Sequence, residues 1–134
     1  MLIAASILTG FAALIHVYIF YMESLAWTSK RTRATFGLTE EQARSTQEMA
    51  FNQGFYNLFL AIAVFVGLVY LALGNQAVGA TLLFVGAGSM VAAAVVLFIF
   101  SADKRAAALK QGVIPALGLI ALVLALGECL MVCV

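Results

Sequence analysis

The chain has few charged residues. Asp, Glu, Lys and Arg make up only 10% of it, whereas soluble domains typically contain about 25%. The formal net charge is +1, so the sequence offers no basic surface for nucleic acid. Hydrophobic residues instead reach 65%, against about 45–50% in ordinary soluble domains. This composition is typical of an integral membrane protein.

Cysteine and histidine are also scarce. Cys129 and Cys133 lie one helical turn apart in the last hydrophobic run, where two neighbours on one helix make a poor disulfide pair. Whether they have any role is left open. The only histidine, His16, lies in the first run, so no histidine accompanies the cysteines and we predict no metal site. Walker, dinucleotide and HExxH motifs are absent from the sequence.

Long hydrophobic runs fill most of the sequence. They predict an all-α protein, a single domain over residues 1–134 with four transmembrane helices, because each run can cross a hydrocarbon core of about 30 Å. Gly74-Asn75-Gln76 predicts a tight turn between the second and third helices, and Pro115 marks the first turn of the fourth. The helices are expected at about residues 2–22, 40–73, 77–100 and 113–133.

The basic residues predict the topology. All seven lie between the first and second runs or between the third and fourth: Lys30, Arg31, Arg33, Arg44, Lys104, Arg105 and Lys110. By the positive-inside rule both loops are cytoplasmic and both termini face outward, in a multi-pass membrane protein. No basic residues precede the first run and no small-residue cleavage site follows it, so we interpret it as a retained helix rather than a signal peptide.

The first cytoplasmic loop contains a helix start. Thr39 with Gln42 matches a capping box, which predicts that the second helix begins near Glu40 and runs unbroken to residue 73. Glu40, Arg44 and Glu48 follow at i, i+4 spacing, so a ladder of ion pairs is expected on the protruding end.

Polar side chains cover about half the circumference of the second helix. Glu48, Asn52 and Tyr56 form one row, and Gln53 and Asn57 form a second row beside it. A single amide there is most simply a contact between helices, but the whole group exceeds what packing needs. Lipid cannot face so wide a polar arc. We therefore expect one row to face the bundle and the other a polar cavity or a neighbouring subunit, in a homo-oligomer surrounded by membrane lipids.

The first helix offers a partner surface. His16, Glu23 and Trp27 are spaced by seven and four residues, which places them on one stripe of a regular helix. His16 alone could be a packing residue, and Trp27 an interfacial aromatic. Together the two helices predict a polar ligand pocket that opens to the cytoplasm. Its candidate residues are His16, Glu23, Trp27, Glu48, Asn52, Gln53, Tyr56 and Asn57.

Three functions fit this pattern. The favoured one is a membrane enzyme or binding protein for a lipophilic ligand, in which Tyr56 or His16 handles protons and the amides orient a polar head. The alternative is a small proton-coupled exporter of cationic compounds, with Glu23 as the exchanging carboxylate. Glu23 lies close to the membrane interface, however, and alternating-access sites lie near the midplane. A structural role is the third interpretation, and whether the protein is an enzyme is left open.

Two segments carry a family resemblance. HVYIFYMESLAW, the basic loop after it, and EMAFNQGFYNLFLA resemble an uncharacterised bacterial family of four-helix integral membrane proteins, a domain of unknown function. The resemblance covers nearly the whole chain. It implies a small four-helix protein of the cell inner membrane and brings no established activity.

A more distant resemblance is to the membrane-associated proteins in eicosanoid and glutathione metabolism. It implies a trimer that binds glutathione between subunits. That family's second helix has an Arg, a His-x-Asn step and a Glu-Asn pair, and Asn52 and Asn57 match the two Asn positions. Ala50 and Tyr56 stand where that pattern has its His and Glu. Glutathione is therefore a hypothesis drawn from the resemblance alone.

Overall fold

A computed structural model describes the backbone of residues 1–132 and the side chains of residues 1–128. This part of the chain is helical and contains no strand. Four segments are long and apolar enough to cross a membrane, which confirms the predicted four-helix class. The long helices, with the π-helical turn η1 that continues the first, are α1 (Leu2–Phe20), η1 (Tyr21–Leu25), α4 (Gln47–Ala72), α5 (Gln76–Phe100) and α6 (Arg105–Val132).

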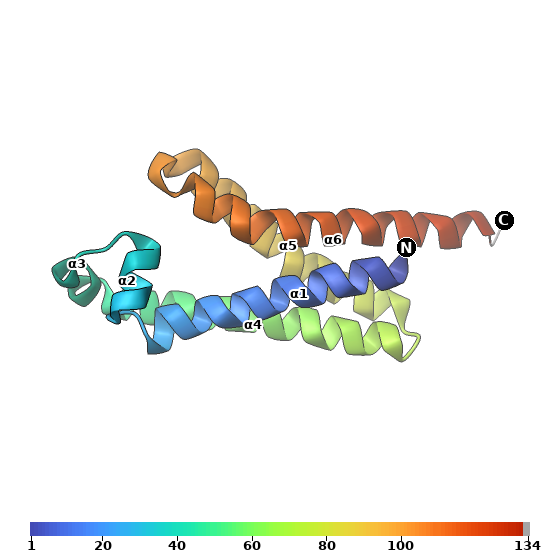
Figure 1. Cartoon of the computed structure of the whole chain (residues 1–134). Helices are drawn as coiled ribbons and strands as arrows, with labels where there is room; N and C mark the ends of the chain where they lie inside the picture. Colours follow the sequence, from blue (N-terminus) through green and yellow to red (C-terminus); the bar gives the residue numbers. More distant parts are fainter. Residues whose placement is uncertain (133–134) are drawn as a thin grey trace.

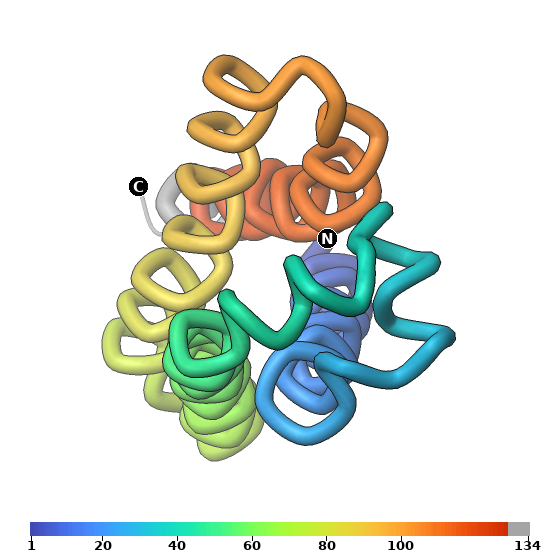
Figure 2. The backbone as a smooth tube through the Cα atoms, turned by 90° about the vertical axis from the view of Figure 1, so that its left-hand side faces the viewer, coloured from blue at the N-terminus to red at the C-terminus, as the bar shows by residue number. Residues whose placement is uncertain are grey.

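The four helices form a closed ring in the order α1, α4, α5, α6. Each packs against the next, α6 returns to α1, and α1 and α5 lie diagonally opposite with few contacts (Figures 1 and 2). The short helices α2 (Lys30–Phe36) and α3 (Glu40–Ser45), and the 3-10 turn η2 (Ala102–Lys104), lie at one end of the ring. We call this the loop end. The α4–α5 turn and the start of the chain lie at the opposite end (Figure 1).

Small residues make the ring compact. The buried cluster between the helices is rich in alanine, including Ala5, Ala12 and Ala87. Glycines allow two of the closest approaches: a Cβ on Gly86 would lie 3.0 Å from the Leu60 carbonyl, and one on Gly118 would lie 3.1 Å from the Thr9 nitrogen. In lipid, where helices gain little from hydrophobic burial, such close packing is a main source of helix association.

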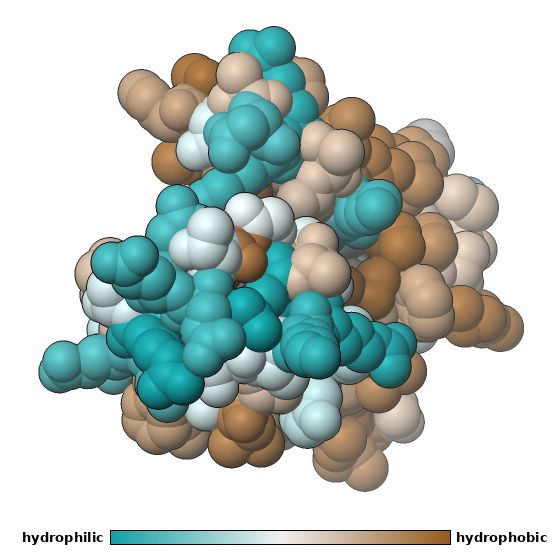
Figure 3. Space-filling model, turned by 60° about the vertical axis from the view of Figure 1, so that its left-hand side comes forward, coloured by the Kyte–Doolittle hydropathy of each residue, from teal (hydrophilic) through white to brown (hydrophobic). Residues whose placement is uncertain are grey.

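The loop end carries the charge. All seven Lys and Arg lie in α2, α3, η2 or the first residues of α6, and hydrophilic residues gather at this end while apolar residues cover the flanks (Figure 3). The bundle thus has one basic end, as the sequence predicts. Which side of a membrane that end faces stays a prediction.

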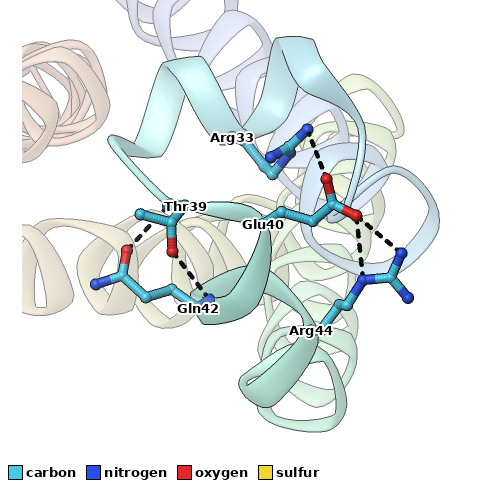
Figure 4. A network of polar contacts seen from close by, with 5 residues as sticks. All are labelled: Arg33, Thr39, Glu40, Gln42 and Arg44. Atoms are coloured by element: carbon cyan, nitrogen blue, oxygen red, sulfur yellow. Dashed lines mark hydrogen bonds and ion pairs between the residues drawn. The ribbon is translucent and has the colours of Figure 1, made fainter.

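The predicted turn and cap are confirmed. Gly74 has φ 81° in the tight turn between α4 and α5, and the Asn75 side chain then accepts a hydrogen bond from the Val78 nitrogen at 3.2 Å. In the capping box the Thr39 nitrogen donates to Gln42 Oε1 at 2.9 Å, and the Gln42 nitrogen donates to Thr39 Oγ1 at 3.2 Å (Figure 4).

The ion pairs differ from the predicted ladder. Glu40 pairs with Arg44 at 2.9 Å, but its second partner is Arg33, at 3.6 Å (Figure 4). Glu48 makes no ion pair among the side chains of residues 1–128. The hydrogen bond and charge of Arg44, with the charge of Arg33, hold the pKa of the Glu40 carboxyl below its ordinary value.

The predicted second helix is not continuous. It divides at Thr46, which has φ −107° and ψ 7°, into α3 and α4. The Thr46 hydroxyl donates to the Gln42 carbonyl at 2.7 Å and accepts from Trp27 Nε1 at 3.2 Å. A threonine that donates a hydrogen bond to the carbonyl four residues earlier often bends a helix. Here the same hydroxyl also accepts the hydrogen bond from Trp27.

The predicted start of the fourth helix is wrong. α6 begins at Arg105, so Pro115 lies inside the helix rather than in its first turn. The residues that extend it, Ala106 to Lys110, are mostly strong helix formers. The proline is fully buried, so packing holds it inside the helix although a proline there lacks a backbone donor and its ring crowds the carbonyl four residues earlier.

Candidate functional site

The first and second spanning segments meet at Glu23 and Asn57. Asn57 Nδ2 on α4 donates a hydrogen bond of 2.8 Å to Glu23 Oε2 on η1. The same amide also donates to the Gln53 carbonyl at 3.2 Å. Both side chains are half-buried, and Glu23 belongs to the spanning segment Leu2–Leu25. The structure thus brings together two of the eight predicted residues, one from each helix.

A close backbone contact fixes this meeting point. Ser24 Oγ donates to the Phe51 carbonyl of α4 at 2.8 Å. A Cβ on Gly54 would overlap the Ser24 hydroxyl and would lie 3.0 Å from the Ser24 nitrogen and 3.1 Å from Glu23 Cβ. Because position 54 has no side chain, η1 can lie directly against α4. The candidate residues predicted from the sequence include neither Ser24 nor Gly54, although a glycine inside a helical run is a signal of close packing.

The π-helical turn places Glu23 and Ser24 against α4. Its characteristic bond is the one from the Ala26 nitrogen to the Tyr21 carbonyl, at 3.0 Å. A π turn inserts one extra residue into the helical repeat, and such turns recur at functional sites. After it the chain leaves the helix at Ala26, with φ −127° and ψ 20°.

Trp27 lies beyond this turn and not on a stripe with His16 and Glu23. Its ring packs against Phe36 at 5.1 Å between centroids, and its N–H donates to Thr46. The predicted common stripe is wrong for Trp27 because the helix ends before that residue. Trp27 instead ties α2 to the junction of α3 and α4.

His16 lies inside the ring, on the same face of α1 as Thr9, Ala12 and Ala13. Only 2% of it is exposed, and Nδ1 lies 2.8 Å from the Ala12 carbonyl, to which it donates. Nε2 has no hydrogen-bond partner among the side chains of residues 1–128. Among residues 1–128, no hydrogen bond or ion pair joins His16 to Glu23.

The remaining candidates face away from the bundle. Four polar side chains of α4 are exposed: Glu48, Asn52, Gln53 and Tyr56. We call Glu48, Asn52 and Tyr56 the outer row. The predicted pocket is therefore divided, with Glu23 and Asn57 at the contact of α1 and α4 and the outer row on the opposite face of α4.

An aromatic row follows one face of α4 and meets α1. Phe51, Phe55 and Phe59 follow one another on α4, with centroid separations of 5.0 and 6.2 Å. Phe20 of α1 meets Phe55 edge to face at 5.1 Å. Apolar rings thus lie along the two helices that hold the carboxylate.

The glutathione hypothesis gains no support from the surroundings of Glu23. No lysine, arginine or histidine of residues 1–128 forms an ion pair with Glu23, and Arg44 is paired with Glu40. Ala50, where the distant family pattern has a histidine, is buried. No step through glutathione is assigned.

Metal ligands do not gather in the described part of the chain. No group of three His, Cys, Asp or Glu there could hold an ion. The side chains of Cys129 and Cys133 lie outside that part.

Comparison with known proteins gives a family. No curated protein and no solved structure matches the chain. The family model described as "Protein of unknown function (DUF1304)" matches residues 10–123. The matched range contains all of η1 to α5, and with them the Glu23–Asn57 contact. The chain therefore belongs to this DUF1304 family, whose activity is not established.

Proposed function

We propose that this membrane protein binds a lipophilic ligand whose polar head donates a hydrogen bond to Glu23. The observation that carries the proposal is that the Glu23 carboxylate has one side-chain hydrogen-bond donor, Asn57, among residues 1–128. Asn57 occupies one oxygen, and no cation of residues 1–128 lies within ion-pair distance. A carboxylate has about four acceptor sites, and leaving them unsatisfied inside a membrane is costly. An amine or hydroxyl head group would satisfy them.

The aromatic contact between α1 and α4 suits the rest of such a ligand. Phe20 of α1 packs on Phe55 of α4, and Phe51 packs on Phe55, so apolar rings join the same two helices that Glu23 and Asn57 join. Ligand sites commonly combine an apolar lining with a few polar groups that orient the head. We infer a ligand that lies along α1 and α4 with its head at the loop end. The proposal covers binding and assigns no reaction.

Location and assembly complete the proposal. The concentration of basic residues at the loop end supports an inner-membrane protein with both loops in the cytoplasm, so the head would enter from that side. The outer row supports self-association, because exposed Glu48, Asn52 and Tyr56 would otherwise face lipid.

The binding proposal is tested by what purifies with the protein. Organic extracts of the wild type, Glu23→Gln and Asn57→Leu are compared by mass spectrometry. Glu23→Gln keeps the acceptor for Asn57 but loses the charge, so ligand affinity should fall about 10- to 100-fold, as for a lost charged hydrogen bond of about 1.5–3 kcal/mol. Asn57→Leu should lower it as well, because the carboxylate loses its positioning partner.

Glu41→Gln is the matched control, since Glu41 is an exposed carboxylate in α3. It should retain the ligand. The proposal is wrong if all four proteins carry the same compounds in the same amounts. If proteoliposomes with a pH gradient accumulate a cationic dye and Glu23→Gln stops this uptake, the exporter is the better interpretation. The position of Glu23 argues against an exporter, because Glu23 lies near the end of the span Leu2–Leu25 and alternating-access sites lie near the middle of the membrane.

A further inference from the structure

A second feature lies on the other half of the ring, between α5 and α6. A cavity of about 290 Å³ opens there, and its lining is apolar, with Val95 and Phe98 from α5 and Leu109 and Val113 from α6. By comparison, an engineered cavity of about 150 Å³ is large enough to hold benzene. The groove therefore has room for part of a hydrocarbon chain.

Glycine and alanine form the floor of this groove. Gly112 lies so close to α5 that a Cβ there would meet the Ala94 side chain at 2.5 Å. Both residues line the cavity. The two helices touch at this point, and larger apolar side chains line the rest of the groove.

A cation is held at the mouth of the groove. Arg105 Nε donates to the Phe98 carbonyl at 3.1 Å, and the guanidinium carbon lies 5.1 Å from the centroid of the Phe98 ring. Phe98 thus both lines the groove and fixes the cation beside it. The terminal nitrogens of Arg105 make no hydrogen bond with residues 1–128, so they can bind an oxyanion.

The charge around Arg105 favours an anion. Residues 101–112 contain three basic residues, Lys104, Arg105 and Lys110, against the single acid Asp103. Arg105 lies near the start of the spanning segment Ala102–Glu128, and the groove lies within it. A basic cluster at that depth meets phospholipid head groups, whereas the groove meets acyl chains.

We propose that the α5–α6 groove is a binding site for an anionic phospholipid. One acyl chain lies in the groove against Val95 and Val113, and the phosphate binds the Arg105 guanidinium. Charge complementarity selects this occupant, because a zwitterionic lipid would meet the same groove without a net attraction to the basic cluster. The proposal is independent of the ligand at Glu23, which lies between α1 and α4.

The test is a lipid titration of the purified, delipidated chain followed by native mass spectrometry. Dioleoyl phosphatidylglycerol is compared with dioleoyl phosphatidylcholine, which has the same acyl chains. We expect one phosphatidylglycerol per chain, bound about fivefold or more tightly than phosphatidylcholine. Arg105→Gln should lower the phosphatidylglycerol affinity about fivefold, as for one cation near an anionic surface, and should lower the phosphatidylcholine affinity less, because choline already balances the charge of that lipid's phosphate. Arg31→Gln, at an exposed arginine of the same end, should change neither.

The groove itself is tested by filling it. Val95→Phe should lower the affinity for both lipids several-fold. Val96→Phe is the control, because Val96 is the next residue and similarly exposed, 56% against 50%, but does not line the groove. Equal affinity for the two lipids, or equal effects of Arg105→Gln and Arg31→Gln, would overturn the proposal. If Val95→Phe leaves lipid binding intact and instead shifts the oligomeric state in the same spectra, the groove holds a second copy and not a lipid.

Discussion

At the residue scale, the Glu23 site depends on a missing side chain. Gly54 lets Ser24 reach the Phe51 carbonyl, and this contact holds Glu23 within 2.8 Å of the Asn57 amide. The hydrogen bonds and the close approach are therefore coupled. A change at position 54 would move the carboxylate without touching it.

Gly54→Ala should lower stability. The added Cβ overlaps the Ser24 hydroxyl, which costs about 1–3 kcal/mol as overpacking, and the helix propensity of alanine returns only about 1 kcal/mol. The midpoint of unfolding in mixed detergent measures the change. Gly88→Ala is the matched control, because a Cβ there has nothing within 4 Å, and it should be neutral or slightly stabilising. Equal midpoints for the two variants would contradict this account, and Ser24→Ala should partly restore the Gly54→Ala protein.

The sequence places both interacting residues among its eight candidates, but it predicts neither their pairing nor the shape of the site. Glu23 and Asn57 stand out because polar groups are rare in these runs. Trp27 is misplaced because spacing arguments assume a regular helix, whereas the π turn Tyr21–Leu25 changes the helical phase and then ends the helix. The direction in which the outer row points also depends on which face of α4 packs against α1. No local sequence pattern predicts that face.

At the scale of the element, local signals predict well and non-local ones do not. The Thr39–Gln42 capping box is confirmed because all of its hydrogen bonds lie within four residues. The break at Thr46 involves Trp27, nineteen residues earlier, so the sequence around it reads as one helix. Pro115 misleads for a similar reason. A proline is common at a helix start, but packing can also keep one in a helix interior.

Thr46→Val should loosen the junction of α3 and α4. The change removes the acceptor of the Trp27 N–H and the donor to Gln42, each worth about 0.5–1.5 kcal/mol. Trp27 is the only tryptophan, so tryptophan fluorescence reports directly on its surroundings. We expect the emission maximum of the variant to shift to the red and acrylamide to quench it more strongly.

Thr81→Val is the control for the junction. Thr81 makes the same back-bond, to the Ala77 carbonyl at 2.8 Å, in a different helix. The tryptophan fluorescence of the Thr81→Val protein should match that of the wild type. Identical spectra for Thr46→Val and the wild type would mean that the hydrogen bond does not hold Trp27 in place.

At the scale of the whole molecule, the sequence predicts the number of spans and the charged end, because both follow from composition. The order of the helices around the ring follows only from the contacts between them, which composition does not predict. These contacts leave Glu48, Asn52 and Tyr56 on the outside, within the span Gln47–Ala72. A protein with such a face in lipid has reason to associate with another copy.

Asn52→Leu should therefore weaken an oligomer. Each hydrogen bond between membrane helices contributes about 0.6–1.7 kcal/mol, so its loss lowers the association constant roughly three- to twentyfold per contact. Light scattering of the protein in detergent over a range of concentrations measures this shift. Ser89→Ala, a change at an exposed polar residue of α5, should leave the mass unchanged. If the wild type is monomeric at every concentration, the outer row does not hold subunits together.

The alanine-rich interior determines what mutagenesis can detect. Seven of the twelve residues in the central cluster are already alanine, so an alanine scan would remove almost nothing there. The informative experiment adds atoms. A scan with leucine or phenylalanine would give its largest effects where neighbouring helices touch, and tolerated positions would outline the surfaces open to lipid, ligand or a second subunit.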